Sequence, residues 1–107
     1  MIIASVRFPL RPGTTDEDIS KVFEASAPKY RKVPGLLAKH YVFGNGRGGG
    51  IYLWESRPSA EQLYTPEWQA GVAGRYGGPP EIEWLDNPVT VDNVAGRIIF
   101  AAAESKS

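Results

Sequence analysis

The chain has 107 residues, which is enough for one domain with a single hydrophobic core and too few for a second lobe. Twelve basic and twelve acidic side chains cancel, so charge gives no reason to expect nucleic acid or an anionic membrane as a partner. The absence of cysteine excludes a disulfide framework, a thiol nucleophile and a thiolate metal site. We therefore expect one domain over residues 1–107.

The N-terminus and the hydropathy pattern bear on location. Residues 1–8 lack the basic segment and the long apolar segment of a signal peptide, and no apolar run approaches the ~18 residues of a membrane span. We expect a soluble, cytoplasmic protein that has no membrane partner.

The first third of the chain predicts a strand followed by a helix. Ala4, Val6 and Phe8 alternate with polar residues, which is typical of a strand with one buried face. Thr14 and Glu17 have the spacing of a capping box at a helix start. Apolar residues then recur at helical spacing as far as residue 30, and a proline at position 28 should kink the helix or end its regular part.

Gly44, Gly46 and Gly49 have the G-x-G-x-x-G spacing of a dinucleotide-binding fingerprint. That fingerprint requires a helix directly after the glycines, whereas an aromatic and β-branched run follows them here. We therefore predict a β-hairpin with strands at about 36–43 and 50–55, joined by a glycine-rich loop. A bound nucleotide is not expected.

The second half predicts two short helices and a fourth strand. Pro58 lies near the start of the first helix, and Thr65 with Pro66 restarts the second. Residues 81–85 alternate as a strand, and residues 86–93 read as an irregular or edge segment. The order β-α-β-β-α-β predicts an α+β, ferredoxin-like subunit with one antiparallel sheet and both helices on one face.

Both faces of the predicted sheet carry large apolar side chains. On the strand at 50–55, Tyr52 and Trp54 point one way and Ile51 and Leu53 point the other. Helices cover only one face, so we expect the second face to be buried against another copy, as a homodimer. Residues 94–107 are expected to form a C-terminal arm that packs on the partner chain or covers an edge of its own sheet.

The run VPGLLAKHYV, a glycine-rich turn and GGGIYLWES resemble the signature of the small mono-oxygenases of the YdhR type. These group with the antibiotic-biosynthesis monooxygenases among the dimeric α/β-barrel proteins. The resemblance spans residues 6–93 and is strongest at Pro34, Gly35, Lys39, Gly49, Gly50, Ile51, Tyr52 and Leu53. It implies a ferredoxin-like subunit, a homodimer whose two sheets close into a barrel, and a pocket between sheet and helices. It also implies an oxygenase without metal or flavin.

The side chains themselves favour an aromatic ligand over metal chemistry. One histidine and no cysteine are a poor supply for a catalytic metal site, which usually takes about three protein ligands. Aromatic residues with polar tips are plentiful, and such residues stack on flat ligands and orient them through O–H or N–H donors. We predict that a phenol-like or quinol-like compound binds, with no cofactor. The candidate substrate-binding residues are Lys39, Tyr52, Trp54, Tyr64, Trp68, Arg75 and Tyr76.

His40 is the candidate catalytic base because its ordinary pKa suits proton abstraction at neutral pH. A structural histidine, solvated or bonded to a backbone carbonyl, is the alternative. For Lys39 the alternatives are an anion anchor for substrate or peroxide and a salt bridge to an acidic residue of the other half. Arg75 either closes over a ligand or is solvated at a helix end.

The leading hypothesis is a cofactor-independent monooxygenase that forms a substrate anion with a base and holds it in a dry pocket, after which the anion reacts with O2. Two alternatives stay open. One is a binding protein of the same fold for a small hydrophobic metabolite, without catalysis. The other is a haem-handling barrel in which His40 is the axial ligand.

Overall fold

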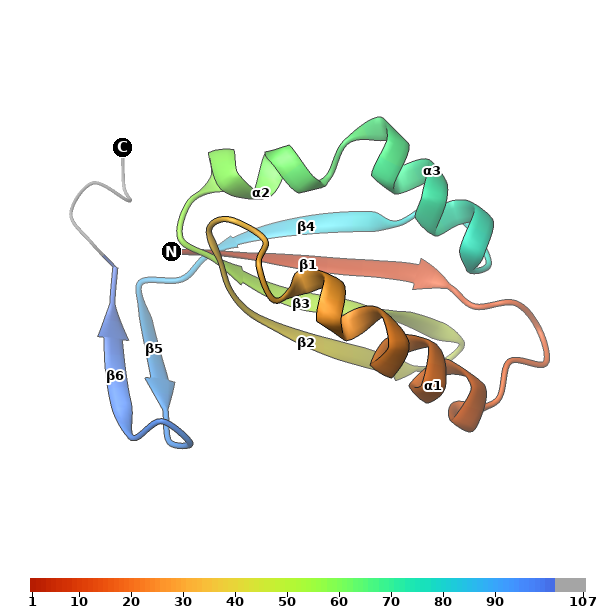
Figure 1. Cartoon of the computed structure of the whole chain (residues 1–107), viewed down its shortest axis with the longest axis horizontal. Coiled ribbons are helices and arrows are strands. Elements are labelled where there is room, and N and C mark those ends of the chain that lie inside the picture. Colours follow the sequence, from red (N-terminus) through yellow and green to blue (C-terminus); the bar gives the residue numbers. More distant parts are fainter. Residues whose placement is uncertain (102–107) are drawn as a thin grey trace.

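The computed structural model of the protein describes residues 1–101, and residues 102–107 lie outside the described part. The elements in chain order are β1 (Ile2–Pro9), α1 (Asp16–Ser26), the 3-10 helix η1 (Ala27–Tyr30), β2 (Leu36–Gly44), β3 (Arg47–Trp54), α2 (Arg57–Leu63), α3 (Pro66–Arg75), β4 (Glu81–Asp86), β5 (Val89–Asp92) and β6 (Arg97–Phe100) (Figure 1). Within that part of the chain, no helix has the length and apolar character needed to cross a membrane.

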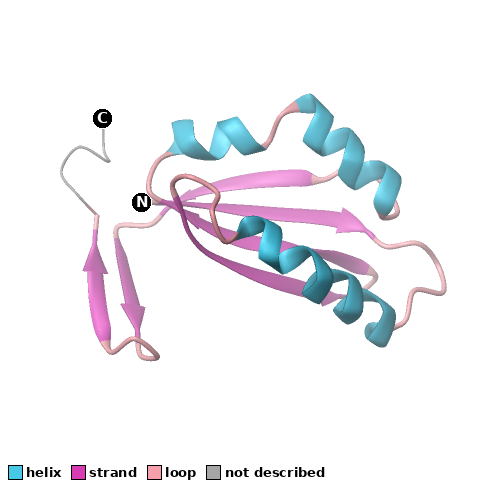
Figure 2. Ribbon diagram, viewed as in Figure 1, coloured by secondary structure: helices cyan, strands magenta, loops and turns pink. Residues whose placement is uncertain are grey.

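Strands β1 to β4 form one antiparallel sheet in the order β2-β3-β1-β4, and the helices cover one of its faces (Figure 2). Ala4, Val6 and Phe8 of β1 are buried against those helices, as their alternation predicts. The α+β, ferredoxin-like subunit predicted from the element order is confirmed. Among residues 1–101 no helix covers the opposite face of the sheet, which is called the open face below (Figure 2).

Helix α1 begins one residue later than the capping-box spacing predicts. Thr15, not Thr14, is the N-cap: its hydroxyl accepts a hydrogen bond from the N–H of Asp18, and the Asp18 carboxylate accepts one from the N–H of Thr15. The helix ends at Ser26, and Pro28 lies in the 3-10 turn η1 that follows. The proline therefore ends the regular helix, because it has no N–H for the helical ladder.

The hairpin between β2 and β3 is tighter than predicted. Asn45 and Gly46 form a two-residue turn, both with positive φ (55° and 74°), which is the geometry that matches the twist of a hairpin. Residues 47–49 therefore belong to β3 and not to the loop, which corrects the predicted strand start at residue 50. The glycine run is part of the central sheet, and no helix follows it.

The segment after β4 forms a separate two-stranded hairpin of β5 and β6, set beside the main sheet (Figure 1). The predicted irregular segment at 86–93 thus includes a short strand. One face of this hairpin is apolar and exposed, through the pairs Val89 with Phe100 and Val91 with Ile98. The predicted arm at 94–107 contains β6, and its last six residues lie outside the described residues.

We predict that replacing two different glycines with alanine changes the free energy of unfolding in opposite directions. A Cβ on Gly49 would lie 1.8 Å from the carbonyl oxygen of Val6, so Gly49→Ala should lower the free energy of unfolding by roughly 2–4 kcal/mol. Gly71 lies within α3 and has open space at the Cβ position, so Gly71→Ala should raise it by about 0.5–1 kcal/mol. Urea unfolding measures both changes. A neutral Gly49→Ala substitution would contradict the close approach of β1 and β3.

Candidate functional site

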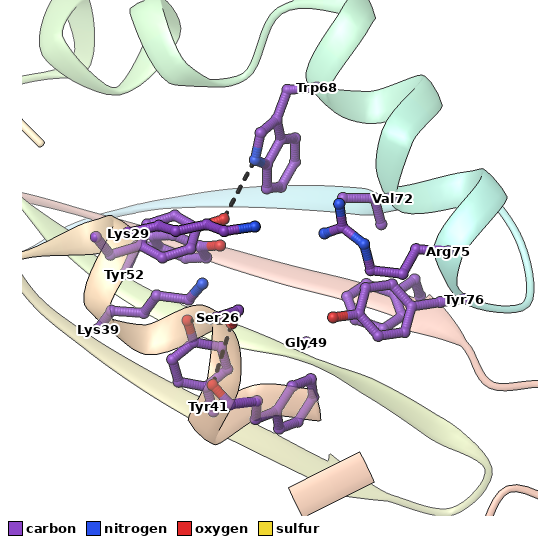
Figure 3. A pocket seen from close by; sticks show the side chains of 13 residues that line it. Ser26, Lys29, Lys39, Tyr41, Gly49, Tyr52, Trp68, Val72, Arg75 and Tyr76 are labelled. Atoms are coloured by element: carbon purple, nitrogen blue, oxygen red, sulfur yellow. Dashed lines mark hydrogen bonds between the residues drawn. The ribbon is translucent and has the colours of Figure 1, made fainter. Parts of the chain in front are cut away.

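A pocket lies on the helix-covered face of the sheet, between α1 and η1 on one side and α3 on the other (Figure 3). Most of its wall is aromatic, and the rest is supplied by three cationic side chains, a serine, a valine and a glycine. The lining residues are Phe8, Phe23, Ser26, Lys29, Tyr30, Lys39, Tyr41, Gly49, Tyr52, Trp68, Val72, Arg75 and Tyr76.

The pocket side chains are fixed by contacts between elements that are distant in sequence. The Trp68 indole N–H donates to the Tyr30 hydroxyl at 3.3 Å and so joins α3 to η1. The hydroxyls of Ser26 and Tyr41 share a hydrogen bond of 2.7 Å, which joins α1 to β2. Tyr76 stacks on Phe8 with ring centroids 4.2 Å apart. These three contacts fix the positions of Trp68, Tyr41 and Tyr76 in the pocket wall.

The end of α3, which carries Arg75 and Tyr76, is held by the loop after β1. The Arg11 guanidinium donates to the carbonyl oxygens of Arg75 and Gly74 at 2.9 and 2.6 Å. These carbonyl groups belong to the last turn of the helix, where carbonyl oxygens have no N–H partner within the helix. The helix dipole also favours a positive charge at this end. Arg11 thus positions the helix end at the pocket mouth.

Lys39 is the central polar group of the pocket. Its Nζ lies 3.4, 3.9 and 4.6 Å from the ring centroids of Tyr30, Tyr41 and Tyr52. Among the described residues no carboxylate lies within ion-pair distance of this amine. Burial lowers the pKa of Lys39 to about 7, while the ring faces attract the ammonium form. The amine therefore changes its protonation state near neutral pH.

Burial keeps Tyr41, Tyr52 and Tyr76 in the protonated form. Burial raises the pKa of Tyr41, Tyr52 and Tyr76 above that of a solvated tyrosine. For Tyr41 the hydrogen bond with Ser26 acts in the opposite direction, as does the nearby Arg75 charge for Tyr76. These hydroxyls are neutral hydrogen-bonding groups at physiological pH.

The charged side chains that line the pocket are all basic. Figure 3 shows the amino groups of Lys29 and Lys39 and the guanidinium of Arg75 directed toward the same space. None of the lining residues carries a carboxylate. This arrangement favours an anion or a group that becomes anionic.

The pocket brings together five of the seven predicted substrate-binding residues: Lys39, Tyr52, Trp68, Arg75 and Tyr76. The other two, Trp54 and Tyr64, are buried in the neighbouring core and bonded to each other, the Trp54 indole N–H donating to the Tyr64 hydroxyl at 3.1 Å. They support the wall from behind and do not line the cavity.

His40, the predicted catalytic base, lies outside the pocket. It is exposed on β2, on the open face of the sheet, opposite Ile51 of β3, whereas Lys39 pairs with Tyr52 on the helix-covered face. Alternation along the strand separates the two neighbours, because successive side chains point to opposite faces. His40 does not line the pocket, and its role as the base stays a prediction that the position of the pocket does not support.

Sequence reasoning did not assign Tyr30, Tyr41, Ser26 or Lys29 to the site. Tyr41 shares the alternation of Lys39, so the face of β2 could have indicated it. Tyr30 and Lys29 lie in the 3-10 turn after α1, where the helical period no longer applies. Their place in the pocket follows from how that turn packs on the sheet.

The free space beside Lys39 is divided into two cavities. The inner pocket leaves about 40 Å³, which is room for about one water molecule. A second cavity of about 240 Å³ lies between η1 and β2, and Tyr30, Lys39 and Tyr41 line both. Lys39 therefore stands between the two spaces.

The donor set does not fit a metal centre or a haem. In the described part of the chain no three His, Cys, Asp or Glu residues gather at metal-binding distances. The pocket lining includes no histidine, cysteine or methionine, which are the usual axial ligands of haem iron. Tyrosine is a rarer ligand, and the raised pKa of Tyr41, Tyr52 and Tyr76 opposes the phenolate form that such a ligand requires.

Comparison with known proteins identifies the fold. No protein-family profile matches the chain, and no curated protein sequence does. Among solved structures, the ActVA-Orf6 monooxygenase of Streptomyces coelicolor, in complex with nanaomycin D, is similar with a TM-score of 0.61 and 18% identity, over 84% of this chain and 89% of that one. A candidate antibiotic biosynthesis monooxygenase from Caulobacter crescentus CB15 has a TM-score of 0.59 and 24% identity, over 80% and 88% of the two chains.

A third similar structure is a point mutant of MhuD with two manganese protoporphyrin IX molecules bound per active site. Its TM-score is 0.62 and its identity 19%, over 86% of this chain and 99% of that one. The fold is thus the ferredoxin-like fold of the antibiotic biosynthesis monooxygenase-like proteins, as the sequence resemblance implies. At these identities the likeness concerns the fold alone.

We predict that removing the Lys39 amine stabilises the protein in a pH-dependent way. Below pH 7 both folded and unfolded chains hold the proton, and the folded state bears the full cost of the buried ammonium. Lys39→Met should raise the free energy of unfolding at pH 6 by roughly 1–3 kcal/mol, less than the full shift because the amine is partly solvated.

Between pH 7 and the ordinary lysine pKa, only the unfolded chain holds the proton, so the advantage of Lys39→Met should shrink as pH rises and vanish near pH 10. Urea unfolding of both proteins at several pH values measures the difference. An advantage that stays constant across this range would contradict a lowered pKa.

Proposed function

We propose that the protein is a cofactor-independent monooxygenase that oxidises a small phenol-like or quinol-like compound in the pocket around Lys39. The observation that carries this proposal is a partly buried amine that faces three tyrosine rings and has no carboxylate partner among the described residues. Flat aromatic walls favour a planar ligand, and the fold is shared with proteins described as monooxygenases.

In this proposal Lys39 is the base. Its neutral amine accepts the proton of the substrate hydroxyl, and the resulting ammonium pairs with the phenolate. A phenolate transfers an electron to O2 far more readily than a phenol does. One oxygen atom then enters the ring and the other leaves as water, so a phenol and O2 give a quinone and water without an external reductant.

Lys29 and Arg75 have the second role, which is to hold negative charge. Their cationic groups face the same space as Lys39, where the oxyanion and the reduced oxygen species would form. Fixed charges in a site with little water stabilise such anions more strongly than solvated charges do. Tyr76 supplies stacking surface and a hydroxyl group, and Trp68 supplies stacking surface.

The small inner volume means that a substrate must displace side chains to enter. About 40 Å³ cannot hold an aromatic ring, but the adjoining cavity of about 240 Å³ can, and Lys39 separates the two. A swing of the flexible Lys39 side chain would join them. A binding protein without turnover would use the same walls, and oxygen uptake distinguishes the two functions.

We predict that Lys39→Met lowers the rate of oxygen uptake with naphthols or naphthoquinols by about 10²–10⁴, the usual contribution of a general base. The wild-type rate should rise with pH through an apparent pKa near 7, because only the neutral amine accepts the proton. A substrate whose hydroxyl is already ionised should be much less affected. An oxygen electrode and quinone absorbance measure the reaction.

Two variants serve as controls for that experiment. Lys21→Gln removes an exposed lysine that is paired with Glu17 on α1 and should leave the rate unchanged. His40→Gln should also keep the rate, because His40 faces away from the pocket. A loss of activity in His40→Gln with full activity in Lys39→Met would reverse the assignment of the base.

We also propose that two subunits pair through the open faces of their sheets. A cross-strand row of apolar side chains crosses this face: Ala38, Leu53, Ile3 and Leu85. Leu85 is 47% exposed within the subunit. Burying such a face is what a two-fold partner would do, and obligate interfaces of this kind cover ~2,000 Å² or more.

The expected result is a dimer at micromolar concentration that Leu53→Glu converts to a monomer, since a carboxylate at the centre of the face would be buried without a partner. Sedimentation equilibrium measures the mass. Val22→Glu, an apolar-to-acidic change on the exposed side of α1, should leave the dimer intact. A wild-type monomer would remove this proposal and leave the catalytic one to be judged by oxygen uptake.

A further inference from the structure

Lys39 borders the second cavity, called the side cavity below, as well as the inner pocket, and the side cavity has room for a ligand while the Lys39 side chain stays where it is. The cavity of about 240 Å³ between η1 and β2 is bordered by Tyr30, Lys39 and Tyr41, and its remaining wall includes Leu36, Leu37 and Arg31. An apolar cavity of about 150 Å³ is enough to hold a benzene molecule. This side cavity therefore has room for one substituted aromatic ring next to the amine.

Burial and the lack of a carboxylate partner among the described residues favour the neutral, nucleophilic form of the amine, against the attraction of the ring faces for the ammonium form. The ring faces of Tyr30, Tyr41 and Tyr52 surround Nζ at 3.4 to 4.6 Å, and no carboxylate among the described residues holds the proton in place. At neutral pH an exposed lysine has a free lone pair in well under 1% of molecules, because its pKa is near 10.4. Burial lowers the pKa of Lys39 to about 7, so about half of these amines have one.

We propose that Lys39 is a covalent capture site for small aromatic aldehydes and ketones, which enter the side cavity and form an imine with its amine. The nitrogen lone pair attacks the carbonyl carbon and forms the C–N bond, and one amine hydrogen passes to the carbonyl oxygen as a proton. The carbinolamine then loses this hydroxyl and the second amine hydrogen as water, the C–O bond breaks, and a C=N bond is left. The step requires no oxidant, reductant or further reactant.

The ligand class follows from the cavity walls. Tyr30 and Tyr41 offer ring surfaces, and Leu36 and Leu37 offer aliphatic surface, so a single ring fits better than a polar or extended chain. Arg31 at the same cavity suits a carboxylate or hydroxyl on the ring, at the end away from the carbonyl group. Benzaldehyde and carboxybenzaldehyde are therefore the matched probes.

The experiment traps the imine. Wild-type protein is incubated at pH 7 with benzaldehyde and sodium cyanoborohydride under argon, and peptide mapping measures the benzyl group on each lysine. Lys39 should be labelled at least about tenfold faster than the exposed Lys21 and Lys32, since far more of its amines are neutral. Equal labelling of the three lysines would overturn the proposal.

The pH dependence gives a readout that a merely accessible lysine would not produce. The ratio of Lys39 labelling to Lys21 labelling should fall as the pH rises from 7 to 10, because exposed lysines lose their protons in that range. Formaldehyde, which needs no aromatic cavity, should show a smaller preference for Lys39 than benzaldehyde does. An equal preference with both aldehydes would overturn the role of the side cavity.

Two variants complete the design. Lys39→Arg keeps a cation but removes the nucleophile, and the fast-labelled site should disappear. Lys32→Arg makes the same change at an exposed lysine that does not line the pocket, and fast labelling at Lys39 should persist. The trapping proceeds without oxygen, so its failure is separate from a failure of oxygen uptake.

Discussion

The pocket depends on a central strand that carries no side chains over three consecutive residues. A Cβ on Gly50 would lie 2.9 Å from a ring atom of Tyr52 and 3.0 Å from Cε of Lys39. A Cβ on Gly48 would lie 3.1 Å from ring and methyl atoms of Phe8 and Leu10. At these distances a methyl group would fit only if the neighbouring side chains moved. The glycines let the stem of Lys39 and the neighbouring rings occupy the surface of β3, and the position of the amine follows from that.

The same arrangement links stability and chemistry. Placing an amine among three tyrosine rings without a carboxylate makes the folded state bear part of the cost of a buried charge. That cost is also what gives the amine a free lone pair near neutral pH. Evolution usually removes such a group from a core unless the site uses it, which is why strongly shifted ionisable groups gather at functional sites. Lys39 is therefore the residue that the proposed function depends on most.

Local patterns in the sequence predicted the four strands of the main sheet, their faces and the fold, because alternation and helix caps act over a few residues. The face of β2 is an example: the pattern already separates His40 from Lys39. What it did not reveal is which face bounds the pocket, since that depends on packing of distant helices. Trp54 and Tyr52 share a face of β3, yet α2 and Tyr64 cover Trp54 fully. Tyr30 joins the site only because Pro28 converts the helix end into a 3-10 turn.

The contact between Arg11 and the last turn of α3 affects how readily this turn can move away from the pocket. Two hydrogen bonds tie this turn to the loop after β1, and Gly71 and Gly74 make the helix easy to deform just before it. Outward movement of the turn would carry Arg75 and Tyr76 away from the pocket together. Such a movement would require Arg11 to release the two carbonyl groups, and it would also break the hydrogen bond from the Gly77 N–H to the Pro9 carbonyl oxygen and the stack of Tyr76 on Phe8. Arg11, which does not line the pocket, would thus act as a latch on this turn.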